Sequence, residues 1–449
     1  MHPLPRTNSR LKRLLVATIA AATASVVLSG TTPAQAGVKV TPGSFTGYGF
    51  DQCAAPAQST MNTWMEHSPF SAVGIYIAGD SRGCRSQPNI TRSWVANQLD
   101  NGWRLLPITL GAQASCSTHF PRYGNDKTIS PRSAKNYFQA RKQGRFEATR
   151  AVNTAKGLGI PRRSTLWYDL EGFNIGNTAC RESALRFLHA WTVRVHGLGY
   201  TSGVYSSASS GIKMLDDARV HRPKAFALPD QVWIADWDGR ANLHSKYVRP
   251  AGWRPHSRMK QYRGGHNETW GGAGINIDSN YISTGNGSHF PPSPKHCNGR
   301  VSIDKRSYPG IGPRQRDSEA ITVLQCMLRE KNFYKGRLNG KFSRATIKAI
   351  RGFQRSRGLI VRNAFPRAAW VKIHTEGPTR TVKRGSVGPL VRRLQRALTA
   401  ATNKPVPVTG VFNARTEAVT KSWQRNVKLR RSGVINTAAW ARLRAGRLG

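Results

Sequence analysis

Two carboxylates lie two positions apart at the end of an apolar run in the stretch TLWYDLEGF, residues 165–173. They are Asp169 and Glu171. In a β-strand, residues i and i+2 point to the same face, so both side chains would reach one site. A close pair of carboxyl groups suits acid-assisted cleavage of a glycosidic bond, because proximity raises the pKa of one of them and keeps it protonated. The alternative is two ordinary acids that begin a loop.

Three further acids end apolar runs, although the chain holds only 22 Asp and Glu residues. They are Asp51, Asp236 and Asp278. An Asp at a strand end often caps the next helix or folds a turn, and that interpretation is open for each one alone. Taken together, the five acids predict a carboxylate site that binds and cleaves a glycan.

Aromatic residues near the same run ends would suit stacking against sugar faces, although each one singly could serve the core instead. Those expected to bind substrate are Tyr76, Tyr205, Trp233 and Tyr262, and Tyr168 and Trp237 lie at similar positions. The 12 histidines form no HExxH or comparable cluster, and no CxxC occurs. The sequence therefore predicts neither a metal site nor a cofactor.

Eight short apolar, β-branched or aromatic runs would position these residues. They cover residues 46–53, 72–79, 103–111, 165–173, 201–208, 231–239, 258–265 and 275–282. Helical patterns lie between several of them, at 57–67, 91–101, 131–158 and 179–197. Strands that alternate with helices imply parallel pairing, and eight of them predict an α/β fold, a (β/α)₈ TIM-like barrel. Short or absent later helices indicate a barrel that is irregular in its second half; an open doubly wound sheet is the alternative.

The first 36 residues have the pattern of a secretory signal peptide. Four basic residues precede the apolar run LLVATIAAATASVVLSG, and Ala34-Gln35-Ala36 supplies small residues for cleavage. A membrane anchor is the alternative, but the run is only weakly apolar and no later run is long enough to span a bilayer. We therefore expect a secreted protein that lacks a transmembrane segment.

Six cysteines in an exported chain predict disulfides. Loops that follow adjacent parallel strands are neighbours at one face of a barrel, which favours the pairs Cys53–Cys84 and Cys116–Cys180 over the other pairings. Cys297 and Cys326 would join the end of a linker to the first helix of the region beyond it.

A Gly-, Pro- and Ser-rich stretch, GNGSHFPPSPKHCNG, separates the barrel from an internal repeat with a period of 70 residues. Each repeat is expected to be a small all-α domain of three short helices, and most matched apolar residues are expected to be core. The predicted divisions are 1–36 (signal peptide), 37–46 (N-terminal segment), 47–284 (barrel), 285–303 (linker), 304–377 (first repeat) and 378–449 (second repeat).

The formal charge is +47, and residues 300–449 hold 34 Lys and Arg against 6 Asp and Glu. For an exported protein such a charge favours an anionic partner, namely wall polymers or lipid head groups before nucleic acid. An Arg-rich genome with selection for solubility is the alternative. No recognisable nucleic-acid-binding motif occurs.

The motifs GFDQC, LWYDLEG, GVYSS, VWIADW, KQY and INIDSNY resemble, in order and spacing, the glycoside hydrolase family 25 lysozymes. They resemble more closely the glycoside-hydrolase-like domain of unknown function 1906, over about residues 47–283. The resemblance implies cleavage of the muramic acid to glucosamine linkage, with Glu171 as general acid, Asp169 beside it, and Asp51 and Asp278 as flanking acids. Asp236 stands where those lysozymes do not usually rely on an acid.

The repeats resemble the peptidoglycan-binding domain of exported wall enzymes, through VLQCMLREKNFYKGRLNGKFSRATIKAIRGFQ and RLQRALTAATNKPVPVTGVFNARTEAVTKSWQ. Both depart from the usual Asp-Gly before the Phe, with Asn339-Gly340 and Thr409-Gly410.

Together these features predict a secreted, wall-associated and monomeric peptidoglycan glycosidase, held on peptidoglycan and anionic wall polymers by its repeats. The rival hypothesis is a wall-binding protein whose barrel recognises glycan without cutting it.

Overall fold

The computed structural model describes residues 39–124, 126–314 and 317–449. The predicted signal peptide lies outside the described residues. Among the helices of the described part, none is long and apolar enough to cross a membrane.

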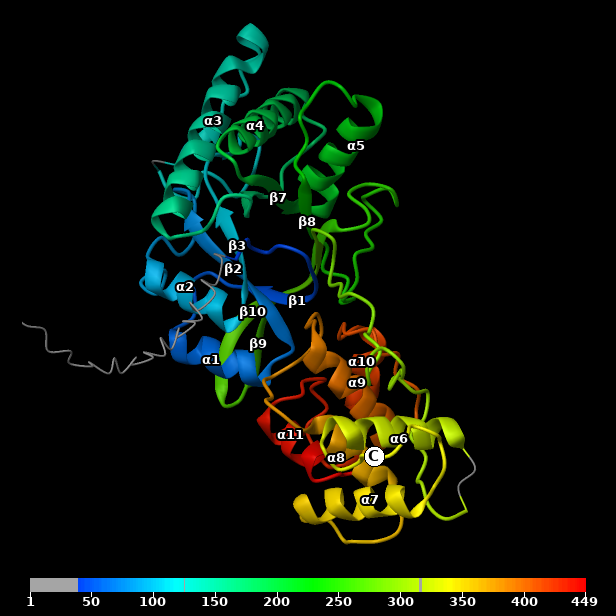
Figure 1. Ribbon diagram of the computed structural model, residues 1–449. Coiled ribbons are helices and arrows are strands. Elements are labelled where there is room, and N and C mark those ends of the chain that lie inside the picture. The colour runs from blue at the N-terminus through cyan, green and yellow to red at the C-terminus, as the bar shows by residue number, and fades with distance from the viewer. Residues whose placement is uncertain (1–38, 125, 315–316) are drawn as a thin grey trace, which may run out of the picture. The chain divides into compact units, whose positions relative to one another are not determined.

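Eight strands close into a barrel in the order β1-β10-β9-β8-β7-β6-β3-β2 (Figure 1). Each of the eight predicted runs contributes one of these strands. Their bounds are β1 Phe45–Asp51, β2 Phe70–Ala78, β3 Arg104–Thr109, β6 Thr165–Leu170, β7 Thr201–Ser207, β8 Gln231–Ala235, β9 Ser257–Trp270 and β10 Ala273–Thr284. The closed order confirms the barrel and excludes the open doubly wound sheet. A separate two-stranded sheet, β4 (Gln113–Ala114) with β5 (Thr128–Ile129), lies in the connection after β3.

The expectation of parallel pairing throughout the barrel is wrong at β10. This strand pairs antiparallel with both β9 and β1. The connection from β9 to β10 is only Gly271-Gly272, and both glycines have positive φ. A parallel return needs a crossover of a dozen residues or more, so a two-residue connection forces a hairpin.

The helices predicted between the early strands are all present. They are α1 Gln58–His67, α2 Arg92–Asn101, α3 Ala134–Gly157 and α4 Thr178–Gly197. Side-chain caps begin two of them, because Thr91 accepts from Trp94 N and Asn177 accepts from Cys180 N. A short π-helix, η1 (Ala208–Ile212), and α5 (Lys213–His221) lie between β7 and β8. Among the described residues no helix separates β8 from β9. The second half is therefore irregular, as predicted.

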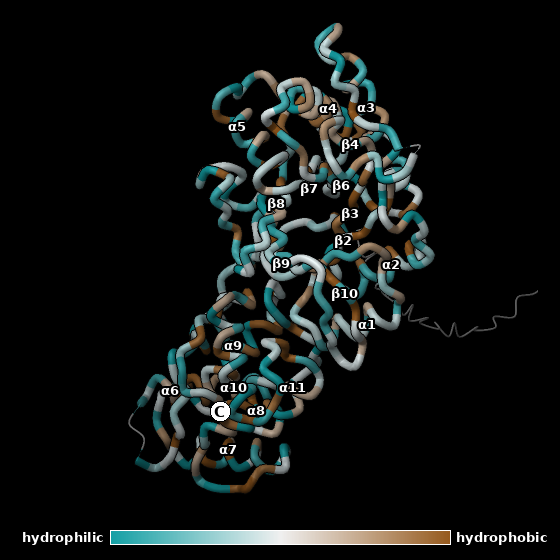
Figure 2. The backbone as a smooth tube through the Cα atoms, turned by 180° about the vertical axis from the view of Figure 1, so that it is seen from behind, coloured by the Kyte–Doolittle hydropathy of each residue, from teal (hydrophilic) through white to brown (hydrophobic). Residues whose placement is uncertain are grey.

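Large side chains fill the interior of the barrel, which is a packed core and not a pore. Trp167 and Trp233 are fully buried there, with ring centroids 5.7 Å apart in an edge-to-face arrangement. A second apolar layer lies between the strands and the helices around them. Figure 2 shows the resulting apolar stretches along β2 and β3. Strands buried on both faces leave only their ends free to carry polar chemistry.

Each repeat contains three helices, as predicted. The first holds α6 Ser318–Glu330, α7 Arg344–Ser356 and α8 Arg367–Thr375; the second holds α9 Pro389–Thr402, α10 Ala414–Asn426 and α11 Thr437–Arg444. Equivalent residues cap the middle helices, since Ser343 accepts from Thr346 N and Asn413 accepts from Thr416 N.

Buried glutamines explain why the repeats share polar positions. Gln395 is fully buried, donates to Val411 O (2.9 Å) and Thr416 Oγ1 (3.0 Å), and accepts from Gly410 N (3.0 Å). Gln325 makes the corresponding bonds in the first repeat, to Lys341 O, Thr346 Oγ1 and Gly340 N. These matched residues are structural, because each accepts a hydrogen bond from the backbone N–H of a buried glycine, Gly410 or Gly340.

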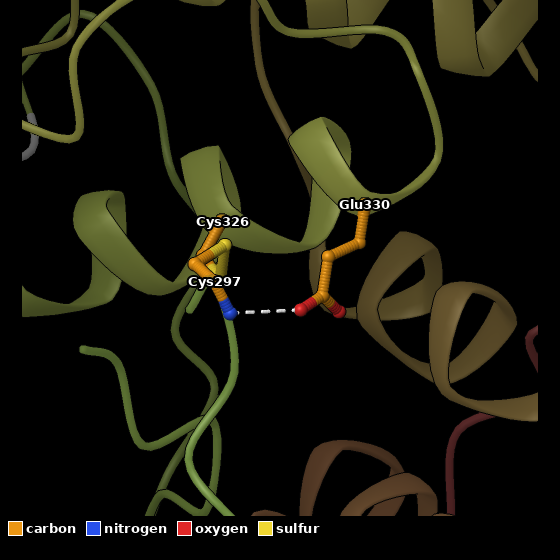
Figure 3. Close-up of side chains that lie close together, drawn as sticks. All are labelled: Cys297, Cys326 and Glu330. Atoms are coloured by element: carbon orange, nitrogen blue, oxygen red, sulfur yellow. Dashed lines mark hydrogen bonds between the residues drawn. A yellow bond between two sulfur atoms is a disulfide. The ribbon is translucent and has the colours of Figure 1, made fainter. Parts of the chain in front are cut away.

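All three predicted disulfides are present: Cys53–Cys84, Cys116–Cys180 and Cys297–Cys326. The last joins the chain before the first repeat to α6, and Cys297 N also donates to Glu330 Oε1 at 2.9 Å (Figure 3). These three residues form the one close group of potential metal ligands found among the described residues. Because the two sulfurs are bonded to each other, the group is a structural clamp.

Candidate active site

A cavity of about 480 Å³ opens at the carboxyl ends of the parallel strands. Its lining includes Asp169 and Glu171 from the end of β6, Tyr205 from β7, and Asp236 and Trp237 from the segment after β8. Acids that are far apart in the sequence come together here because parallel strands place their carboxyl ends at one face of a barrel. The structure thus brings three of the five predicted acids to one cavity.

The other two acids, Asp51 and Asp278, lie opposite each other on the β1–β10 pair. The side-chain amide of Gln261, which also lines the cavity, links them. Its Nε2 donates to Asp51 Oδ1 (3.1 Å) and Oδ2 (3.2 Å) and to Asp278 Oδ2 (3.2 Å). Asn280 Nδ2 donates to Asp51 Oδ1 at 2.6 Å. All five predicted acids therefore belong to one connected group at the barrel mouth.

Burial dominates the electrostatics of this group. It raises the pKa of Asp51 to about 8, with a further contribution from the negative charge of Asp278. It also raises the pKa of Asp278. The pKa of Asp169 lies well above its ordinary value, first because the carboxyl is buried and then because Glu171 is close. A perturbed carboxyl that lines a cavity, as Asp169 does, is typical of sites that move protons.

A second glutamine, Gln113, fixes the strand end that carries Asp169 and Glu171. Gln113, in β4, is 1% exposed. Its Nε2 donates to Asp169 O at 2.8 Å, and its Oε1 accepts from Glu171 N at 2.8 Å. Both backbone groups of the strand end are thereby satisfied by one side chain, which holds the directions in which the Asp169 and Glu171 side chains leave the backbone. Tyr76 OH donates to Asp169 Oδ2 at 3.2 Å.

The predicted aromatic residues occupy different places. Tyr205 lines the cavity, with its ring centroid 4.5 Å from that of Trp233. Trp233 itself is fully buried and donates from Nε1 to Asn280 Oδ1 at 2.7 Å, so it supports the site from the core and has no surface for a sugar. Tyr262 neighbours Gln261 on β9, and successive side chains of a strand point to opposite faces, so it lies away from the carboxylates.

Sequence reasoning missed the amide residues Gln113, Gln261 and Asn280 as members of the site. Gln261 and Asn280 lie within the quoted motifs KQY and INIDSNY, and a polar amide in a strand with buried faces is a signal that could have found them. Gln113 follows β3 in the irregular stretch LGAQAS, which carries no such signal.

Residues 62–282 match the Rv2525c-like, glycoside hydrolase-like domain. Residues 317–361 and 387–443 match the putative peptidoglycan binding domain. These matches confirm the expected glycoside-hydrolase-like barrel followed by two peptidoglycan-binding-like repeats. No curated protein matches the chain at a significant level.

Solved structures give weaker likenesses. An uncharacterized B. stearothermophilus protein is 18% identical, with a TM-score of 0.34, over 53% of this chain and 95% of its own. The Mycobacterium tuberculosis Tat-secreted protein Rv2525c, in complex with L-tartrate, is 15% identical, with a TM-score of 0.34, over 53% and 95%. The modular autolysin LytC from Streptococcus pneumoniae is 12% identical, with a TM-score of 0.32, over 53% and 46%. Likenesses of this size carry no argument about activity.

Proposed function

We propose that this protein is a secreted, monomeric peptidoglycan glycosidase of the N-acetylmuramidase type, held on the cell wall by its two repeats. The observation that supports it best is the pairing of Asp169 and Glu171 at one cavity, with the Asp51–Asp278 pair linked to that cavity through Gln261. This constellation lies in a glycoside hydrolase-like domain joined to two peptidoglycan-binding-like repeats. Glycosidic cleavage needs clustered carboxyl groups of which one carries a proton.

In the proposed reaction, Glu171 donates a proton to the glycosidic oxygen as the bond from that oxygen to the anomeric carbon breaks. Asp169 lies beside it and accepts a hydrogen bond from Tyr76; in its ionised form it stabilises the positive charge that develops on the sugar. The Asp51–Asp278 pair orients the substrate or the attacking water, and Asp236 contributes from the lining of the cavity. The 2-acetamido group of the substrate could also assist, and the same residues serve either route.

Two further properties belong to the same proposal. The predicted signal peptide supports export. The basic repeats support retention on peptidoglycan and its anionic polymers, which raises the local substrate concentration without new catalytic contacts.

The test is Glu171→Gln, which removes a proton donor and hardly changes the volume. Release of reducing ends from purified walls should fall at least 100-fold, the size of a general-acid contribution, while wall binding stays at the wild-type level. Asp169→Asn should lose most activity as well. Hydrolysis at the wild-type rate in the Glu171→Gln protein would remove Glu171 as the acid. Wall binding by wild-type protein that releases no reducing ends would favour a barrel that recognises glycan without cutting it.

A further inference from the structure

One aromatic side chain at the cavity differs from all the others in its exposure. Trp237 is the second residue after β8, lines the cavity together with Asp169 and Glu171, and is 67% exposed. Trp is normally well buried, and one that is left open beside a polar cavity is informative. Trp167 and Trp233, in contrast, are fully buried in the barrel core.

Trp237 is exposed but held in place. Its Nε1 donates to Gln261 Oε1 at 2.7 Å, and Gln261 is 1% exposed. The ring also lies against the backbone of β9 at Gly264. A Cβ added at Gly264 would stand 2.4 Å from Trp237 Cζ2 and 2.5 Å from Cε2, closer than any side chain tolerates. Glycine at this position therefore lets the indole lie on the strand, which leaves the rest of its surface to solvent.

The same amide connects the indole to the acids. Gln261 turns its Oε1 to Trp237 and its Nε2 to Asp51 and Asp278. Both ends of the amide have partners that fix its orientation, since Oε1 can only accept and Nε2 can only donate. The distance from the indole to the carboxylates is thus set by one buried side chain.

We propose that Trp237 is the stacking platform for one pyranose ring of the bound glycan, and that it fixes the register of the glycan chain against Asp169 and Glu171. This inference rests on the proposed function and deepens it. The C–H groups on the face of a hexopyranose pack on an indole, while the hydroxyl and acetamido groups at the edge of the sugar remain free for polar partners. A rigid platform orders few side-chain rotamers on binding, so little affinity is lost.

The platform and the repeats bind by different physics. Stacking on a neutral indole depends weakly on ionic strength, whereas attraction between basic repeats and anionic polymers is screened by salt. Binding of a short glycan at the barrel is therefore expected to be insensitive to salt.

The test uses the full-length Glu171→Gln protein and a purified tetrasaccharide of alternating N-acetylglucosamine and N-acetylmuramic acid without stem peptides. Calorimetry gives its Kd with no cleavage. Trp237→Ala should weaken binding about tenfold. Gly264→Ala keeps every side chain of the site but displaces the indole, and it should weaken binding to a similar degree. Gly265→Ala is the matched control, because a Cβ there meets nothing within 4 Å; it should leave Kd unchanged.

Two further arms separate this inference from the proposed function. In the protein with Glu171 intact, Trp237→Ala should raise KM with a smaller effect on kcat. Tetrasaccharide binding that depends on Trp237, in a protein that releases no reducing ends, would retain the platform and remove the hydrolase. An unchanged Kd in the correctly folded Trp237→Ala protein would overturn the platform even if hydrolysis is found. An aromatic ligand such as a purine oligonucleotide that binds through Trp237 while the tetrasaccharide does not would also overturn it.

Discussion

Asp51 and Asp278 face each other across the antiparallel β1–β10 pair, and the amide of Gln261 donates to both carboxylates. Two acids in this position exist because β10 reverses direction, so that a residue in the middle of β10 lies opposite the last residue of β1. Burial and mutual repulsion then disfavour the state in which both are ionised.

The free energy of unfolding should depend on pH because of the Asp51–Asp278 pair. The pKa of Asp51 is about 8 in the folded protein and 3.8 ordinarily. Between those values the folded carboxyl keeps a proton that the unfolded chain has released, so the free energy of unfolding should fall as pH rises from about 4 to 8. Asp51→Asn cannot ionise and should have a Tm several degrees above that of the wild type at pH 8, with the difference vanishing near pH 4. Thermal unfolding from pH 4 to 8 measures it.

Asp100→Asn provides the control, because Asp100 is an exposed acid on α2. It should leave the slope of Tm against pH unchanged. Parallel Tm curves for Asp51→Asn and the wild type would show that Asp51 does not hold a proton in the folded state.

Gln113 should act as a positioning residue for Asp169 and Glu171. Gln113→Met removes both the donor to Asp169 O and the acceptor for Glu171 N. A misplaced carboxyl costs rate more than binding, so kcat on soluble wall glycan should fall about tenfold or more with little change in KM. Gln113→Glu keeps the acceptor and should retain more activity than Gln113→Met at low pH, where the introduced carboxyl is neutral. Equal kcat in all three proteins would contradict the positioning role.

The second repeat should depend on Gln395 for stability. Gln395→Ala leaves the buried Gly410 N without its acceptor and removes one of the donors to Val411 O, which still accepts from Asn413 N. The expected loss is about 1–3 kcal/mol, the cost of leaving a buried polar group without a hydrogen bond. Calorimetry should show a lower transition temperature for the repeats. Arg415→Ala changes an exposed side chain of α10 and should have little effect.

Wall binding should weaken with salt. Residues 300–449 hold 34 basic and 6 acidic residues, and screening shortens the reach of their attraction to about 8 Å at physiological ionic strength. Retention of full-length Glu171→Gln protein on purified walls should fall several-fold across a salt series, without reaching zero. Walls stripped of anionic polymers should show a weaker dependence. Equal retention at low and high salt on both wall preparations would mean that recognition lies in the glycan or peptide.

The sequence by itself determined the strands, the repeats and the acids at the strand ends. Apolar, β-branched and aromatic runs of strand length bounded by turn residues predict strands, and Asp51, Asp169 and Asp236 mark where three of those runs stop. The disulfide pairs that the expected strand order favoured, Cys53–Cys84 and Cys116–Cys180, are present as well.

Tertiary structure decided the rest. Trp233 and Trp237 lie four residues apart in VWIADW, yet one is fully buried and the other is 67% exposed. Both faces of a barrel strand are covered, so its sequence is apolar throughout and does not alternate. The pattern therefore could not show that Trp233 lies within the strand and points into the core, whereas Trp237 lies beyond the end of the strand. Gln113 and Gln261 are joined to acids 56 and 210 residues away along the chain. Such contacts depend on how the strands are ordered around the barrel and on the reversal of β10, which no local pattern records.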